Sequence, residues 1–368
     1  MKRRVFGVMA LVFGLGLLRF GALAIERRPQ RASNTLRREL LALEHFTPPR
    51  KPLEPVIEGS SAELLANANE LSPQELLRAP HARHGGAPAG MATGTTGPGE
   101  VFLSPETLVP RFAELLKTPE ITQCFEALAL GSELTNNTGT HGFAFAEQLT
   151  FAVIQPCSVT FQKADSQTRD QAAAVLESIR LQAPTLAQAF REEDLHQQLK
   201  VFGGWMRAVD RDALPEAAQK LAGSAKQRAP DFMERQKLTS TWLGMTKASR
   251  QAIDALSLKP GDRDSKLSQL HDSLTTPLNT EFGLRFDWPL WLQHHERRLD
   301  AIEQLELMLQ ILKARDASAT WPSLSDRDSG DFEFKPLDDT RADLRSKSTG
   351  LSLTLTHMVP AAADGGTP

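Results

Sequence analysis

The chain has 368 residues, of which 40% are hydrophobic, so it is long enough and apolar enough to bury a sizeable core. Its 42 Lys and Arg residues nearly balance 45 Asp and Glu residues, for a net charge of -3, which argues against nonspecific binding to nucleic acid. Tyrosine is absent, which excludes any mechanism that needs a phenol as acid, base or nucleophile.

The N-terminus predicts export. A positive cluster at Lys2 to Arg4 precedes an apolar run from Val5 to Leu18, the order found in a signal sequence. If Arg19 extends its charged end to the interface, residues 5–25 form a signal anchor long enough to span the inner membrane, with the body in the periplasm. Alternatively, the small residues around Ala24 predict cleavage there and secretion to the periplasm. Both interpretations place the body outside the cytoplasm.

Two cysteines are present, Cys124 and Cys157, separated by 33 positions. In an oxidising compartment they could form a disulfide, and otherwise they are two ordinary buried thiols. The sequence leaves both interpretations open. It contains no CxxC spacing that would indicate redox chemistry or a zinc site.

Residues 26–77 are predicted to form short, exposed helices around a proline-rich strut. The best local signal is Ser72 as a helix cap, followed by Pro73 and by Glu75 at the capping-box position. Residues 78–100 contain six Gly and three Pro and are predicted to be a flexible linker. His81 and His84, near its start, have an HxxH spacing that could recruit a metal ion, but without helical support we interpret them as part of a solvated loop.

Residues 101–320 are predicted to form a helical domain. Capping residues, prolines and apolar spacings of three and four recur along it, and the last helix, from Pro289 to about Arg315, has the most regular apolar stripe. The segment from Lys259 to Asp262 is predicted to be a turn. The acidic cluster between Glu192 and His196, which includes Asp194, is interpreted as a solvated helix face. These patterns predict a helical bundle or stacked helical hairpins.

The pattern then changes to alternation. Residues 321–358 are predicted to form a small antiparallel β-sheet, with reversals at Asp338 and Gly350, that packs on the last helix because it is too small to be stable alone. Residues 359–368 are predicted to be a disordered tail. The predicted fold class is therefore mainly α with a small C-terminal antiparallel sheet.

The start of the last helix carries the one candidate ligand site: Trp291, His294 and Glu296 lie close together in sequence. His295 falls on the apolar stripe and is predicted to be a packing histidine. None of the common nucleophile, phosphate-loop, dinucleotide or metalloprotease motifs occurs, so we predict no catalytic residue, no metal ligand and no cofactor.

Three segments carry a resemblance to known proteins: the Leu-rich helix at 36–44 before Pro48 and Pro49, the closing helix at 301–315, and Trp321-Pro322-Ser323-Leu324 followed by the β segment. This layout resembles a group of uncharacterised bacterial envelope proteins. The closing helix and β segment are also similar to the helix-to-sheet junction of type II secretion pseudopilins, although residues 1–26 lack the prepilin processing pattern.

The resemblance implies an envelope location and no particular activity. We therefore expect a non-catalytic, membrane-tethered or exported envelope protein that acts as an interaction or scaffold module. Its expected partners are the inner membrane, through residues 5–25, and an envelope protein or the cell wall, with no nucleic acid. Two alternatives remain: a hydrolase or small-ligand-binding protein whose site is assembled from separate helices, and an accessory subunit of a secretion or pilus system.

Overall fold

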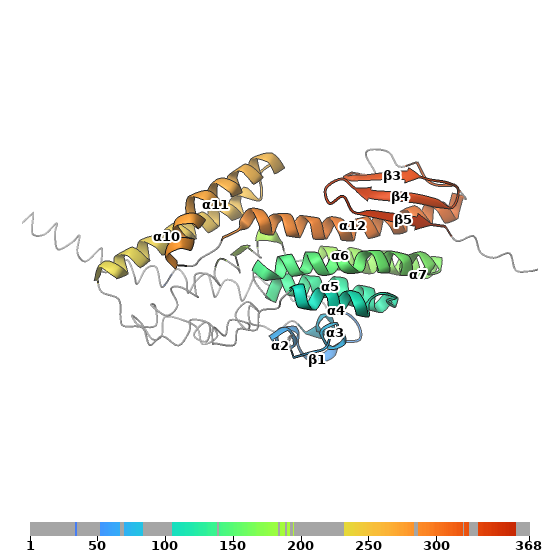
Figure 1. Ribbon diagram of the computed structural model, residues 1–368, viewed down its shortest axis with the longest axis horizontal. Coiled ribbons are helices and arrows are strands. Elements are labelled where there is room, and N and C mark those ends of the chain that lie inside the picture. The colour runs from blue at the N-terminus through green and yellow to red at the C-terminus, as the bar shows by residue number, and fades with distance from the viewer. Residues whose placement is uncertain are drawn as a thin grey trace, which may run out of the picture. The chain divides into compact units, whose positions relative to one another are not determined.

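The computed structural model is mainly helical, with a small three-stranded antiparallel sheet near the C-terminus (Figure 1), as the sequence predicts. It describes residues 52–66, 70–83, 105–137, 140–182, 232–282, 286–318, 320–323 and 330–357, together with residue 34 and six positions between 185 and 194. These divide into two compact units, so the predicted helical domain at 101–320 is shared between them.

The larger unit is a helical assembly with the sheet attached. Its main helices are α4 (Pro105–Leu115), α5 (Ile121–Asn137), α6 (Thr140–Lys163), α7 (Ser166–Leu181) and α12 (Trp288–Ser318). Short connections join α5 to α6 and α6 to α7, and α6 packs against α4, α5 and α12. Helix α6 is therefore the centre of this unit (Figure 1).

Helix α12 forms where the sequence places its most regular apolar stripe. The stripe at positions 302, 305, 309 and 312 is buried, and it belongs to one hydrophobic core with residues of α4 to α7 and of the sheet. Burial of such a stripe stabilises a helix far more than its intrinsic propensity does.

The sheet packs on two helices. Its strands are β3 (Phe332–Pro336), β4 (Arg341–Ser346) and β5 (Ser352–Thr356), in the order β3-β4-β5. Strand β4 contacts α12 and strand β5 contacts α6. Alternate side chains of β4 and β5, among them Leu344, Leu353 and Leu355, are buried, as the period of two predicts.

The segment before α4 corrects two predictions. Helices α2 (Ser61–Ala66) and α3 (Pro73–Leu76), strands β1 (Ile57–Ser60) and β2 (Ala82–Arg83) and the 3-10 helix η1 (Ala79–His81) occupy residues 57–83. The capping box of Ser72 and Glu75 is present as predicted. However, the helices bury their leucines in the core instead of lying exposed, and residues 78–83 are ordered, so the prediction of a linker is wrong for them.

The smaller unit contains α10 (Phe232–Ala255) and α11 (Pro260–Phe282), which contact each other. Pro260 begins α11, so the turn predicted at 259–262 lies earlier, at 256–259, because proline suits the first turn of a helix. In the same unit Asp194 is buried and accepts a hydrogen bond from the Ser249 hydroxyl, which corrects its assignment to a solvated face.

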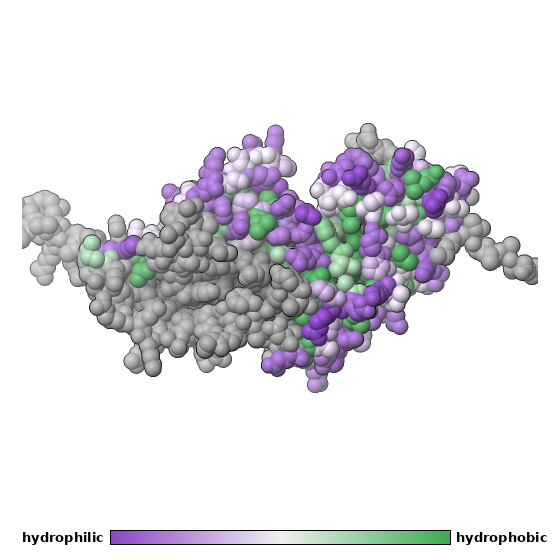
Figure 2. All heavy atoms as spheres, in the orientation of Figure 1, coloured by the Kyte–Doolittle hydropathy of each residue, from purple (hydrophilic) through white to green (hydrophobic). Residues whose placement is uncertain are grey.

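In the part of the chain that is described, no helix combines the length and the apolar character needed to cross a bilayer. The proposed anchor at residues 5–25 and the tail at 359–368 lie outside that part. On the face drawn in Figure 2, the described surface is mostly hydrophilic, with hydrophobic residues scattered in small groups.

Candidate functional site

The three residues predicted as a ligand site do not converge. Trp291 is buried and stacks on Phe143, with ring centroids 6.4 Å apart. His294 is directed at Glu147, whereas Glu296 is exposed. Positions 294 and 296 are about 200° apart around a helix, so the two side chains leave on nearly opposite faces. The start of α12 therefore packs against α6, and Glu296 lies on a different face of the helix from His294.

Glu147, on α6, is the residue that the sequence analysis missed here. Its buried carboxylate accepts a hydrogen bond from His294 Nδ1 and forms an ion pair with Arg297, whose Nε lies 2.9 Å from Glu147 Oε1. The Arg297 guanidinium also lies 5.2 Å from the centre of the Phe151 ring. Because both carboxylate oxygens have charged or polar partners from α12, Glu147 links the two helices.

A buried arginine links α12 to α5. Arg298 is fully buried and donates through Nη2 to the Leu128 carbonyl at 3.0 Å and to the Ser132 hydroxyl at 2.8 Å. Gly131 makes room for it, since a Cβ atom there would lie 2.8 Å from Arg298 Nε. The absence of a side chain at Gly131 thus allows the arginine to lie against α5.

His295 is buried, as the apolar stripe predicts. Burial, and then the nearby positive charge of Arg298, lower its pKa from 6.5 to about 3. The side chain is accordingly neutral at physiological pH and packs edge-on against Phe143. This is the packing role expected for His295 from the sequence.

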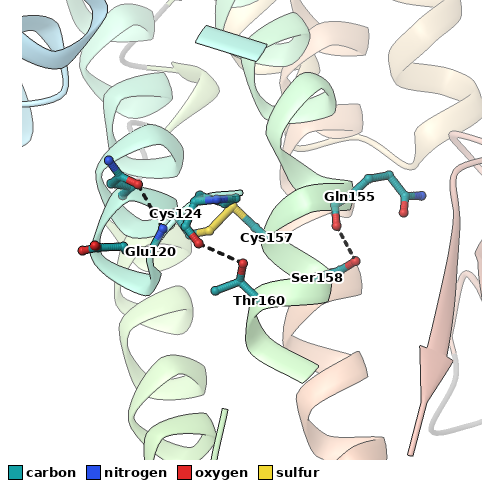
Figure 3. The surroundings of a disulfide bond; sticks show 8 residues. Glu120, Cys124, Gln155, Cys157, Ser158 and Thr160 are labelled. Carbon is teal, nitrogen blue, oxygen red and sulfur yellow. Dashed lines mark hydrogen bonds between the residues drawn. A yellow bond between two sulfur atoms is a disulfide. The ribbon is translucent and has the colours of Figure 1, made fainter. Parts of the chain in front are cut away.

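Cys124 and Cys157 form a disulfide between α5 and α6, with Cα atoms 5.7 Å apart (Figure 3). Both cysteines are fully buried. Close by, the Thr160 hydroxyl donates to the Pro119 carbonyl at 2.9 Å, which ties α6 to the residues that precede α5. The pairing that the sequence left open is therefore present in the structure.

A cavity of about 370 Å³ lies among the Pro52–Glu54 segment, η1, α5 and α7. Most of its lining is apolar, and its wall includes Leu53, Phe125, Val175 and Ile179. Thr122 and Ala174, which also line it, are exposed, so the cavity opens to solvent.

His81 and Glu126 meet in the wall of this cavity. His81 Nδ1 is 3.1 Å from the Leu53 carbonyl, and Nε2 is 2.9 Å from Glu126 Oε1. A carbonyl cannot donate, so Nδ1 carries a proton and one further proton lies between His81 and Glu126. Since both ring nitrogens are engaged, His81 can act as a general base only by giving up one of these bonds.

This pair escaped the sequence analysis because His81 lies 28 positions from Leu53 and 45 from Glu126. Its neighbours in sequence are rich in Gly and Pro, which predicted a solvated loop. In the structure His81 is buried instead. Just before it, the Pro80 carbonyl accepts a hydrogen bond from the Leu53 amide, and just after it, strand β2 pairs with strand β1. No local signal could have revealed those contacts.

Among the described residues, no group of three or more His, Cys, Asp or Glu side chains is placed to hold a metal ion. No protein-family model matches the chain, and neither a curated protein nor a solved structure matches it.

Proposed function

We propose that the chain is a non-catalytic cell-envelope protein, anchored in or exported across the inner membrane, that acts as an interaction module. The observation that carries this proposal is the buried Cys124–Cys157 disulfide. Structural disulfides persist in oxidising compartments such as the periplasm and are rare in the cytosol. The positive and apolar N-terminal pattern supplies the corresponding route of export.

The buried polar groups support an interaction role over catalysis. Glu147 and Arg298 connect α12 to its neighbouring helices, and both nitrogens of His81 are held by oxygen acceptors. These groups are committed to holding the fold. The proposed partner is a protein or the cell wall, reached through the surface of the helical unit.

The outer face of the sheet favours this role over that of a secretion or pilus accessory subunit. The sheet packs on α12 and α6, but the outward positions of β3, β4 and β5 are mainly charged or hydroxyl-bearing, including Glu333, Lys335, Arg345 and Thr354. A subunit that packs into a filament through this face would be expected to present an apolar strip there.

Export can be tested with an alkaline phosphatase fusion after residue 100, because that reporter folds only outside the cytoplasm. We expect an active fusion, and an inactive matched fusion that lacks residues 2–25. Alkylation of the unfused chain under denaturing conditions should find both thiols blocked, whereas the leaderless chain should have free thiols. An inactive full fusion at normal protein level, or free thiols in the full chain, would contradict the proposal.

The interaction role requires a separate measurement. Val159 on α6 is 47% exposed, so a photo-crosslinking amino acid there should capture an envelope component in intact cells. The expected result is a discrete adduct that disappears in the leaderless chain. Absence of any adduct at Val159 and at the exposed Leu181 would argue against an interaction module.

A further inference from the structure

We propose that the cavity beside His81 and Glu126 binds a small organic cation, an ammonium group carried on an apolar body. This inference goes beyond the proposed role in the envelope and does not depend on it. The volume of the cavity, about 370 Å³, lies within the range of natural small-molecule sites, which are mostly apolar with a few placed polar groups.

The apolar wall determines the body of the ligand. Leu53, Phe125 and Val175 line the cavity and are only partly buried, so each retains apolar surface that a ligand could cover. Because the cavity opens to solvent, water can reach this apolar surface. An aryl or alkyl group would remove this surface from water.

The charges that line the cavity determine the head group. Its titratable lining residues are Glu54, His81 and Glu126, and none of its described lining residues is Lys or Arg. The lining thus has two carboxyl groups and one imidazole, so its acidic groups outnumber its basic groups. A ligand that carries a positive charge is therefore favoured over a neutral or anionic one.

Hydrogen bonding leads to the same conclusion. Both nitrogens of His81 are already used, whereas Glu126 spends one oxygen on His81 and can accept several more bonds. Its side chain is 22% exposed, so it remains accessible from the cavity. The strongest available group is thus an acceptor, and the complementary group is a donor such as an ammonium ion.

The fixed position of His81 supports a built site. The ring is held between the Leu53 carbonyl and Glu126, and Leu53 N is itself bonded to the Pro80 carbonyl at 3.0 Å. The carboxylate of Glu126 is therefore oriented before any ligand arrives. Preorganisation of this kind lowers the entropy lost on binding.

The test uses three probes that share a carbon skeleton: 4-phenylbutylamine, 4-phenylbutanol and 4-phenylbutyrate. Binding to the purified full-length chain is measured by calorimetry, with a blank titration into the same buffer and detergent. We expect the amine to bind at least tenfold more tightly than the alcohol, and the acid to bind most weakly. Equal binding of the three probes, or no binding of the amine at millimolar concentration, would overturn the proposal.

Three variants identify the site. Glu126→Gln keeps an acceptor for His81 and should reduce the preference for the amine over the alcohol to about twofold or less. Glu177→Gln, an exposed residue of α7 outside the lining, should leave that preference unchanged. Ala174→Phe, at an exposed lining position, should weaken binding of the amine and the alcohol at least tenfold.

The circular dichroism spectrum and unfolding midpoint of each variant confirm that it is folded. Unchanged binding in both Glu126→Gln and Ala174→Phe would place the amine elsewhere and refute the assignment of this cavity.

Discussion

At the scale of single residues, the burial of His295 makes the stability of the folded chain depend on pH. Its side chain is 5% exposed and its pKa is lowered from 6.5 to about 3, chiefly by burial and then by Arg298. The unfolded chain therefore binds a proton below pH 6.5 that the folded chain does not. Stability from this residue is complete above pH 6.5 and decreases as the pH falls toward 3.

We expect His295→Gln to remove this component of the pH dependence. As the pH falls from 7 to 5, protonation of this histidine in the unfolded chain should lower the unfolding free energy of the wild type by about 2 kcal/mol. Glutamine does not titrate, so the variant should not show this loss. The measurement is urea unfolding of both proteins at several pH values, and the quantity of interest is the difference between their slopes. Parallel stability curves for the two proteins between pH 7 and pH 5 would show that His295 becomes protonated in the folded state.

Residues differ in how far the sequence could predict them. His295 could be assigned to packing because it lies on a long helix whose apolar period fixes which face is buried. His81 and Asp194 could not be assigned, because their partners Glu126 and Ser249 lie 45 and 55 positions away. Glu147 was missed for the same reason, since its partners come from another helix.

At the scale of elements, glutamine side chains hold the sheet to the helices. Gln162 of α6 donates to the Thr354 carbonyl at 3.1 Å and accepts from the Thr356 amide at 2.6 Å. Gln304 of α12 donates to the carbonyls of Leu344 and Leu351. Side-chain amides satisfy the backbone groups of β5 that would otherwise form an open sheet edge.

Alternation along the chain was enough to predict the three strands and their reversals at Asp338 and Gly350. Gly350 has a φ of 72°, a conformation that glycine adopts without strain. The alternation also showed that the sheet needs a partner surface. It did not show that α6 supplies part of that surface, because glutamine is equally compatible with an exposed helix face.

We expect Gln162→Leu to loosen β5. Gln162 is buried, so its loss leaves the Thr356 amide without its partner, at a cost of about 2 kcal/mol in unfolding free energy. Hydrogen exchange at Thr356 should become faster in parallel. The matched control is Gln155→Leu. Gln155 lies about two turns before Gln162 on α6, and its exposed side chain donates to the Ser352 carbonyl. Its effect should be below about 1 kcal/mol, and equal effects of the two changes would contradict this explanation.

At the scale of the whole molecule, the fold class was predictable from the sequence, but the division of the chain into two compact units was not. Helical periods and cap signals recur on both sides of residues 190–230, and nothing in them shows that α10 and α11 belong to a different compact unit from α12. Contacts between distant segments create that division. The same holds for the disulfide, which depends on α5 and α6 lying side by side.

The disulfide should stabilise the larger unit by restricting its unfolded chain. It closes a loop between residues 33 positions apart, for which the chain-entropy model gives about 3.7 kcal/mol. We expect Cys124→Ala, Cys157→Ala and the double variant to lose similar amounts of unfolding free energy, about 2–4 kcal/mol, because either change breaks the same bond. Small additional losses from the missing sulfur atoms are included in that range.

Urea unfolding with and without reductant separates this effect from simple packing. Reductant should lower the stability of the wild type toward that of the variants and leave the three variants unchanged, since they have no disulfide to reduce. If the two single losses instead add up to that of the double variant, and reductant has no effect on the wild type, the two sulfur atoms contribute independently as buried side chains. The covalent link between α5 and α6, and the support it gives to an oxidising location, would then both be withdrawn.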